Sequence, residues 1–483
     1  MAFLLAGCAV GPDFEQPKAP SVERYTPASL PVRTASAPGP AGAAQRFLDD
    51  RDIPGEWWQL FHSAPLNALI EEALKANPTV AATEAALRQA HELTLAGEGA
   101  FFPTVQVGFN ASRNKTAASL SPATASGNLY YSLYSPQLGV SYTPDVFGGT
   151  RRQVEALAAE EESQRFQLEA AYLTLTANLV AAAVTEASLR GQIAATEEII
   201  DIQRQSLDVL RRQQELGHVA GAEVAAQEAA LAQAQTALPP LRKQLAQQRH
   251  LLAVLIGRFP SEQPNAAFDL ASLRLPEELP VTLPSRLVEQ RPDIRAAEAE
   301  LHAASARIGV ATANMLPQIG LSANVGSTAL SIGSLFGPGT AFWTIAANAA
   351  QTIFDAGTLL HKKRAADAAF DLAAAQYKQT VLTAFQNVAD ALQALHTDAD
   401  GLVAASAAEH AAATSLEIAR RQLSLGAVHY LALLNAQNTY QQALNNLVQA
   451  QAARLADTAA LFQALGGGWR NRNGAPVSAA ARI

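Results

Sequence analysis

Charged residues are scarce in this chain of 483 residues and make up only 16% of it, against about 25% in ordinary soluble domains. The 35 basic and 43 acidic residues give a formal net charge of −8, and the basic residues form no run. Because nucleic-acid binding depends on clustered positive charge, the composition predicts no nucleic-acid partner.

Cysteine and the usual catalytic motifs are also nearly absent. The single cysteine, Cys8, excludes an intramolecular disulfide framework, a Cys-based zinc site and a CxxC redox centre. The nine histidines form no HExxH or other close metal-ligand pair, and no GxSxG, P-loop or GxGxxG motif occurs. The sequence therefore predicts no enzyme, no metal site and no cofactor.

A long apolar run is missing as well. The best candidate for a membrane helix is the uncharged stretch 170–185, which contains three threonines and an asparagine. It falls short of the roughly 20 apolar residues that a spanning helix needs. We therefore expect no membrane-spanning helix.

The position of the lone cysteine is informative. Leu5-Ala6-Gly7-Cys8 matches the bacterial lipobox, in which small residues before the cysteine admit the lipoprotein signal peptidase. Residues 1–8 are then a truncated lipoprotein signal, and Cys8 becomes the lipidated N-terminus. The alternative is a small buried thiol. Residues 9–62 contain eight prolines, which predict an extended Pro-rich arm.

Prolines and glycines recur at matched intervals, which indicates an internal duplication. The matched pairs are Pro78 and Pro103 with Pro292 and Pro317, each 25 residues apart, and Gly217 and Gly257 with Gly426 and Gly466, each 40 residues apart. The duplication predicts a first repeat at 63–258 and a second at 284–469. A Pro-rich linker at 259–283 joins them, and a flexible C-terminal tail at 470–483 follows.

Each repeat contains a long stretch with few helix breakers. Neither 150–216 nor 358–425 contains a proline, and each contains one glycine. At about 1.5 Å per residue, such a stretch makes a helix of roughly 100 Å, a length typical of coiled coils rather than globular domains. We predict long helical hairpins with tips at 217–221 and 426–430.

Four shorter segments alternate between apolar and polar residues, the pattern of strands with one apolar face. They lie at about 104–114, 130–143, 318–328 and 341–353. Their polar faces are neutral and their lengths are near the 9–11 residues of a spanning strand. Aromatic residues near their ends predict an interfacial belt: Phe101, Phe102, Tyr130, Tyr131, Tyr134, Tyr142, Phe342 and Trp343.

Four strands cannot close a barrel, and an open sheet in lipid would leave backbone groups unpaired at several kcal/mol each. A membrane sheet therefore requires an oligomer, with 8 strands from two chains or 12 from three. An ordinary amphipathic sheet on a soluble core is the alternative.

Several short motifs carry a family resemblance. They are Cys8-Ala-Val-Gly-Pro-Asp-Phe14, Asp145-Val-Phe-Gly-Gly149, Ile353-Phe-Asp-Ala-Gly357 and Tyr430-Leu-Ala-Leu-Leu-Asn-Ala-Gln437. In this order and spacing, over about residues 8–469, the chain resembles the TolC superfamily of outer-membrane channels, specifically its OprM/NodT-like lipoprotein branch. Each motif alone is weak.

The resemblance implies a mainly α fold with a membrane β-barrel. Three chains would form a 12-stranded barrel in the outer membrane of a Gram-negative bacterium and an α-helical barrel across the periplasm. The implied partners are two further copies of the chain, a periplasmic adaptor protein, an inner-membrane proton-driven transporter and outer-membrane lipid. The implied lipid attachment is at Cys8.

The resemblance also implies a periplasmic gate at Leu431, Asn435 and Asn438, which share one helix face. Related channels usually carry Asp and Arg where this chain has Asn435 and Asn438, so we expect closure by packing and neutral hydrogen bonds. The implied tip and adaptor contacts are Gly217, Glu223, Gly426 and Tyr430. For Glu223, a favourable position at a helix N-terminus is an equal alternative.

Three functions fit these patterns. The favoured one is the passive exit duct of a tripartite efflux pump that carries drugs or other toxic small molecules. The same architecture serves as the exit duct of type I protein secretion systems. The third possibility is a structural periplasmic lipoprotein that conducts nothing.

Overall fold

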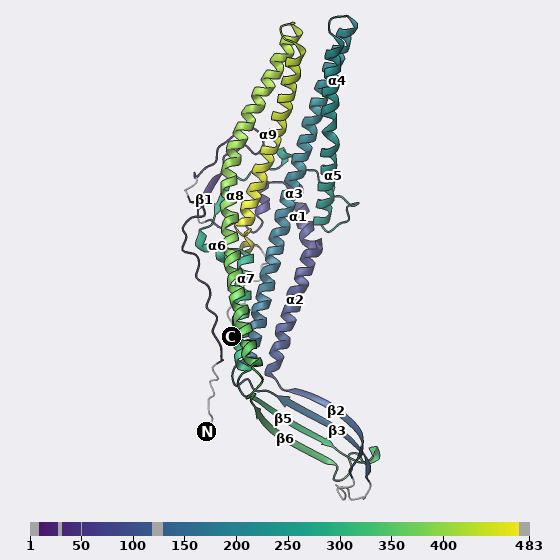
Figure 1. Cartoon of the computed structure of the whole chain (residues 1–483), viewed down its shortest axis with the longest axis vertical. Coiled ribbons are helices and arrows are strands. Elements are labelled where there is room, and N and C mark those ends of the chain that lie inside the picture. Colours follow the sequence, from purple (N-terminus) through teal and green to yellow (C-terminus); the bar gives the residue numbers. More distant parts are fainter. Residues whose placement is uncertain (1–8, 28–30, 50, 118–128, 473–483) are drawn as a thin grey trace. The chain divides into compact units, whose positions relative to one another are not determined.

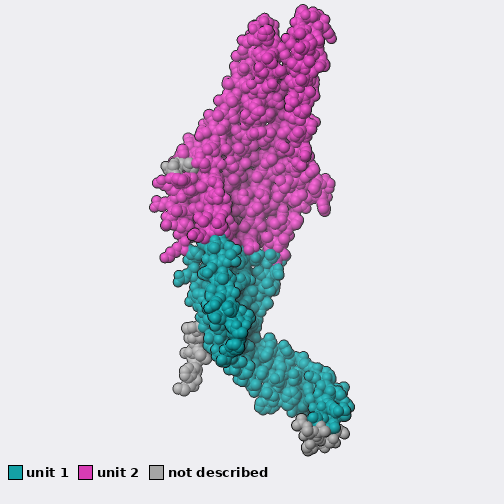
Figure 2. Space-filling view, viewed as in Figure 1, with its two compact units in different colours: residues 1–17, 86–164, 297–377 teal, residues 18–85, 165–296, 378–483 magenta. Residues whose placement is uncertain are grey.

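The computed structural model describes residues 9–27, 31–49, 51–117 and 129–472. Cys8 and the rest of the expected lipoprotein signal lie outside this part of the chain, as do residues 473–483 of the expected tail. The chain divides into two compact units, each assembled from three separate stretches (Figure 2). Unit 1 comprises 1–17, 86–164 and 297–377, and unit 2 comprises 18–85, 165–296 and 378–483.

Unit 1 contains a four-stranded antiparallel sheet in the order β2-β3-β5-β6 (Figure 1). Its strands are β2 (Thr104–Lys115), β3 (Tyr130–Tyr142), β5 (Gln318–Ser327) and β6 (Ala341–Ala350). Two strands come from each repeat, so the first repeat's hairpin pairs with the second's through β3 and β5. The last strand ends at Ala350, three residues before the expected 353, where Ile353 is exposed.

Both long helices begin in unit 1, and an aspartate caps each of them. These helices are α3 (Gly149–Glu215) and α8 (Thr358–Ser424). The Asp145 carboxylate accepts backbone N–H groups of Thr150 and Arg151 at 2.9 and 3.0 Å. The Asp355 carboxylate accepts hydrogen bonds from the backbone N–H groups of Gly357 and Leu359 at 2.9 and 2.7 Å. Satisfying the orphan N–H groups of a helix start explains why Asp recurs in the two strand-to-helix motifs.

The shorter helices of this region precede the sheet in each repeat. Helix α2 (Pro78–Glu98) leads through a 3-10 turn to β2, and helix α7 (Pro292–Ala313) leads to β5. Both begin with proline, whose fixed φ suits the first helical position. Helices α1 (Ala64–Ala76) and α6 (Pro284–Gln290) come before them in the chain.

Unit 2 contains two helical hairpins, α3 with α4 (Gly221–Thr236) and α5 (Leu238–Leu255), and α8 with α9 (Tyr430–Ala464) (Figure 1). Glycines with φ between +66° and +94° end their helices. The chain makes the paired i→i−3 and i→i−5 hydrogen bonds of a Schellman cap at the end of each long arm of both hairpins. The four caps are at Gly217, Gly257, Gly426 and Gly466. The same cap at four places is the physical basis of the repeated 40-residue glycine interval.

The two hairpins differ in their returning arms. The first arm is interrupted at Ala237, and α5 begins with Pro239 and Pro240 in its first turn. Proline lacks the N–H that a continuing helix needs, so it starts a new helix instead. The hairpin predicted for the first repeat therefore returns as two helices, whereas α9 of the second repeat is unbroken over 35 residues.

The Pro-rich arm and the linker are more structured than expected. Within them, β1 (Arg46–Asp49) pairs in parallel with β4 (Glu278–Val281), and Trp57–Phe61 forms a 3-10 helix whose aromatic rings are buried. Trp57 stacks on Phe462 of α9 with ring centroids 5.4 Å apart. The Pro-rich arm thus provides part of the core of unit 2.

Arg454 of α9 fastens the arm. Its side chain is fully buried and donates to the Ala41 carbonyl at 2.8 Å and to Thr34 Oγ1 and Gln45 Oε1, both at 3.2 Å. The amide of Gln45 in turn donates to the Pro276 carbonyl at 3.0 Å. Arm, linker and helix are therefore held by one buried network.

The first residues of the expected flexible tail are ordered. Trp469–Asn471 forms a 3-10 helix, and Asn471 donates to the Ile53 carbonyl at 2.8 Å. Arg472 pairs with the buried Glu169 at 2.8 Å and lies 4.4 Å from the centre of the Tyr172 ring. The prediction of flexibility is therefore wrong for 470–472.

Candidate transport surfaces

The register of the sheet places apolar side chains in rows on one face, since alternate residues point to opposite sides. One row runs from Val107 through Leu138 and Val325 to Trp343. The residues at its two ends are 85% and 74% exposed in the chain. Such a contiguous exposed apolar face is rare on a soluble monomer and marks a membrane or partner contact.

The opposite face is polar and neutral. One row contains Gln106, Gly139, Asn324 and Thr344, and the next contains Gly108, Gln137, Gly326 and Phe342. Amides and glycines alternate between neighbouring strands, and a Cβ added at Gly139 would lie 2.9 Å from Asn324 Oδ1. No strand position on this face carries a charge. Neutral polar groups suit a water-filled lumen.

The register corrects the expected aromatic belt. Tyr131 pairs with Asn114, and Phe342 pairs with Gly326. Both therefore lie on the polar face and cannot contact lipid in a belt. Successive residues of a strand point to opposite faces. Tyr131 therefore lies on the face opposite to that of Tyr130, and Phe342 on the face opposite to that of Trp343.

The remaining belt residues fit the apolar side. Tyr130, Tyr134, Tyr142 and Trp343 share the parity of the apolar rows. Phe101 and Phe102 lie directly before β2, and Phe102 is exposed. At the far end, Lys115 Nζ lies 5.3 Å from the centre of the Tyr130 ring, a cation beside an aromatic ring as at a membrane interface.

The sheet has two open edges in the chain. Strands β2 and β6 each pair on one side only among the described residues. Their outward N–H and C=O groups are available for pairing with another strand.

The hairpin tips belong to unit 2. Gly217 and Gly426 have φ of +76° and +71°, and a Cβ added at either would meet nothing within 4 Å. Glycine is therefore required by the left-handed backbone and not by crowding. Both glycines are exposed. Their role as tip contacts stays a prediction.

Tyr430 does not fit the expected adaptor contact. Its side chain is 5% exposed and packs in a cluster that joins the hairpins. The buried members of this tip cluster are Leu207, Leu210, Val224, Leu416, Ala419, Tyr430, Leu433 and Ala436. Tyr430 is thus a packing residue, because the facing hairpin covers the first turn of α9.

Glu223 lies in the first turn of α4 and is half-buried. Burial, and secondarily the charge of Glu223, raises the pKa of Tyr430. Glu223 therefore stands at a helix N-terminus, which is one of the two expected alternatives. Its role as an adaptor contact stays a prediction.

The expected gate residues Leu431, Asn435 and Asn438 are exposed on one face of α9. Buried residues such as Leu433 and Ala436 occupy the opposite side. The gate face is thus available to other copies of the chain, and its role as a gate stays a prediction.

Two exposed leucines at the tips were not predicted from the sequence. Leu216 and Leu425, each directly before a tip glycine, are 70% and 77% exposed. The sequence signal for them was that each directly precedes the tip glycine at the matching position of its repeat.

Polar side chains are also buried between the helices near the tips. The Gln437 amide donates to Ser206 Oγ at 3.0 Å, and that of Gln227 donates to the Gln203 carbonyl at 2.6 Å. The Oε1 atoms of these three glutamines are buried and have no partner within the described part of the chain.

No group of three or more His, Cys, Asp or Glu side chains that could hold a metal ion occurs among the described residues. In the same part of the chain, one helix, α3, is long and apolar enough to cross a membrane by length and composition, and half of its apolar window is buried against other parts of the protein.

An exposed apolar sheet joined in one chain to two long helical hairpins is the architecture of an outer-membrane channel protein. The sequence profile described as "outer membrane efflux protein" matches residues 69–258 and 283–467, one stretch in each repeat. The chain belongs to the outer membrane efflux protein family. This confirms the resemblance, the fold class and the outer-membrane location.

Individual relatives agree with this assignment. The toluene efflux pump outer membrane protein TtgC of Pseudomonas putida is 30% identical over 474 residues, which cover 98% of this chain and 95% of the relative. The outer-membrane channel OprN has a TM-score of 0.85 at 27% identity and covers 96% of this chain and 100% of its own. The open-state MtrE channel of Neisseria gonorrhoeae has a TM-score of 0.80 at 27% identity and covers 96% and 99%.

Proposed function

We propose that the protein is the passive exit duct of a tripartite efflux pump that carries toxic small molecules out of the cell. Three copies would close twelve strands, four from each chain, into a membrane barrel. An inner-membrane proton-driven transporter would supply the energy, and a periplasmic adaptor would dock on the tips, where exposed Leu216 and Leu425 offer apolar contacts. The relatives named as efflux pump proteins support small molecules as the cargo rather than secreted proteins.

The observation that carries the proposal is the two-faced, open-edged sheet. In lipid, an unpaired backbone group costs several kcal/mol, so β2 and β6 require partner strands. Pairing β2 of one chain with β6 of the next satisfies both edges and turns the apolar rows outward. The neutral polar face would then line the lumen.

Cys8 would carry the lipid in this arrangement, and the face of Leu431, Asn435 and Asn438 would form three rings that close the periplasmic end. The exposure of that face supports the gate. A channel that performs no chemistry needs no catalytic group.

Adjacent residues of β2 provide the test. Val107→Lys places a charge on the apolar face, where it costs about 2–4 kcal/mol at mid-membrane, and should prevent insertion. Gln106→Lys, on the other face, should insert normally and shift the conductance in planar bilayers toward anions. Equal insertion of both variants, or a monomeric mass without conductance, would leave the structural lipoprotein instead.

The cargo is tested separately. Cells that lack the protein should become sensitive to small toxic compounds while their protein secretion stays normal. The reverse pattern would assign the duct to type I secretion.

A further inference from the structure

Charge is almost absent from the four strands of the sheet, and the charge that is there has one sign. Arg113 and Lys115, near the end of β2, are the only charged residues in β2, β3, β5 and β6. The stretch 99–144, which contains the β2–β3 hairpin, has no acidic residue. This hairpin therefore carries positive charge that no carboxylate of its own balances.

Both cations lie on the apolar face of the sheet. Arg113 pairs with Ser132 and Lys115 pairs with Tyr130, and these positions have the parity of Val107. A charge that faces lipid is costly at mid-membrane and is tolerated near an interface, where long basic side chains reach the headgroups. Arg113 stands about 20 Å along the strand from Val107. The two cations therefore mark the level of a membrane interface.

This interface is the one that faces the outside of the cell. Helices α2 and α3 join the β2–β3 hairpin at the Thr104 and Tyr142 ends of its strands, whereas Arg113 and Lys115 stand toward the opposite end (Figure 1). In an outer-membrane channel whose helices extend into the periplasm, the end of the hairpin away from the helices reaches the outer leaflet.

The contacts of the two side chains within the described residues are made with a hydroxyl and a ring. Arg113 Nη1 donates to Ser132 Oγ at 3.0 Å, and Lys115 Nζ lies 5.3 Å from the centre of the Tyr130 ring. Both basic residues are exposed. A guanidinium and an ammonium together offer several N–H donors, and a phosphate supplies both the acceptors and the negative charge that match them.

The same face offers apolar surface on the membrane side of the cations. Phe109 pairs with Pro136, and Val107 pairs with Leu138. The side chains of Phe109, Val107 and Leu138 are exposed. A free phosphate would contact the cations alone, whereas an anionic lipid would contact the cations through its headgroup and these apolar side chains through its acyl chains.

The β5–β6 hairpin of the second repeat has no equivalent cations. The stretch 308–354, which contains this hairpin, has no charged residue. The segment between its strands exposes Leu330, Ile332 and Phe336 instead. Charge complementarity with an anionic headgroup is therefore confined to the first repeat.

We propose that Arg113 and Lys115 form a binding site for the phosphate of an anionic lipid in the outer leaflet, whose acyl chains lie along Phe109 and Val107. The proposal rests on the membrane barrel of the proposed function. Because β2 is an edge strand of the chain, the bound lipid would lie beside the seam where β2 pairs with the next chain.

Native mass spectrometry of the full-length, detergent-solubilised protein tests the site, with lipid A, a phosphorylated glycolipid, as the probe. The variant Arg113→Gln/Lys115→Gln should bind lipid A about thirtyfold more weakly than the wild type. This magnitude follows because each basic residue near an anionic lipid surface contributes about fivefold.

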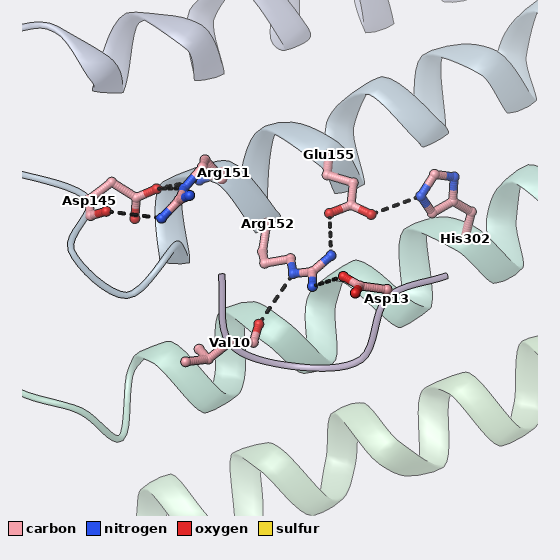
Figure 3. Close-up of polar contacts among 7 residues, drawn as sticks. All are labelled: Val10, Asp13, Asp145, Arg151, Arg152, Glu155 and His302. Atoms are coloured by element: carbon pink, nitrogen blue, oxygen red, sulfur yellow. Dashed lines mark hydrogen bonds and ion pairs between the residues drawn. The ribbon is translucent and has the colours of Figure 1, made fainter. Parts of the chain in front are cut away.

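The matched control is Arg151→Gln/Lys363→Gln, which also removes one arginine and one lysine from unit 1. Arg151 Nε pairs with Asp145 at 3.1 Å (Figure 3), and Lys363 pairs with Asp367 at 2.9 Å. The charges of these two basic residues are already balanced by carboxylates, so the control should bind lipid A as the wild type does.

Further measurements separate charge from shape. Dephosphorylated lipid A should bind equally to the wild type and to Arg113→Gln/Lys115→Gln. The exchanged variant Arg113→Lys/Lys115→Arg keeps both charges and should retain most of the affinity for lipid A. Inorganic phosphate at the same concentration as lipid A should not displace it.

Weaker binding of lipid A by Arg113→Gln/Lys115→Gln alone supports the site. Unchanged binding, equal loss in the control, or the same loss with dephosphorylated lipid A overturns it. Displacement by inorganic phosphate overturns the lipid as the ligand.

The mass and the conductance of each variant are measured in parallel. A conducting trimer that does not discriminate between the two lipids overturns the lipid site and leaves the exit duct standing. A monomer without conductance overturns the exit duct, and the lipid site with it.

Discussion

The hydroxyl of Tyr430 offers the sharpest test of how the tips are held together. The ring is buried between the hairpins beside Leu207, Leu210 and Leu433. The Oη atom is also buried and has no hydrogen-bond partner among the residues that the structure describes. A buried hydroxyl without a partner costs about 1–3 kcal/mol. Tyr430→Phe removes this cost and keeps the ring.

The two substitutions at this position should therefore act in opposite directions. Tyr430→Phe should stabilise the packed tip by about 1 kcal/mol, whereas Tyr430→Ala should destabilise it by about 3–5 kcal/mol through the cavity left behind. Since 1.4 kcal/mol is a factor of ten, the open population should fall about fivefold with Phe and rise more than a hundredfold with Ala.

The assay is single-channel recording in planar bilayers, with thermal unfolding in detergent measured in parallel. Tyr440→Phe is the matched control on the same helix, because the Tyr440 hydroxyl donates to Glu198 at 3.3 Å and its loss should destabilise slightly. If Tyr430→Phe lowers the unfolding temperature or raises the open probability as Tyr440→Phe does, the hydroxyl is hydrogen-bonded in the assembled channel, contrary to the structure.

Three further predictions concern other parts of the chain. Burial, and then a hydrogen bond to Asp457, raises the pKa of Asp398 to about 7 from its ordinary 3.8. Between these two values the folded chain binds more protons than the unfolded chain, so the unfolding temperature should fall as the pH rises from about 4 to 7. Asp398→Asn should flatten this dependence. Arg454→Met leaves buried acceptors unpaired and should lower the unfolding free energy by about 3 kcal/mol in denaturant titrations, whereas Arg46→Met, at an exposed ion pair, should change it by less than about 1. Asn435→Asp should raise cation selectivity in bilayers; unchanged selectivity would remove Asn435 from the constriction.

Local sequence patterns predicted the strands and the helix ends, because the residues within each element largely determine these features. Alternation along 104–114 and 318–328 indicated strands, and the paired glycines marked the helix ends, where a left-handed residue is needed in any context. Pro239 and Pro240 carried the signal for the break in the first hairpin, because prolines interrupt the ladder of helical hydrogen bonds. The family resemblance added the prediction of a trimer, which the structure of a single chain does not display.

Features set by partners distant in sequence could not be predicted. The burial of Tyr430 depends on a hairpin some 200 residues earlier in the chain. The backbone at Gly11 approaches that of Gly309 closely, and the local sequence around either glycine does not identify its distant partner. The placement of Tyr131 and Phe342 on the polar face required the register, since a shift of one residue reverses the side.

The interruption of one returning arm gives the two hairpins different mechanical properties. Helix α9 has a continuous ladder of backbone hydrogen bonds over 35 residues. We therefore expect it to transmit a displacement from one end to the other as a rigid rod. In the first hairpin, α4 ends at Thr236 and α5 begins at Leu238 with two prolines in its first turn, so we expect this arm to bend more easily there. The two matching arms of the repeats are therefore expected to differ in stiffness, the second being the stiffer.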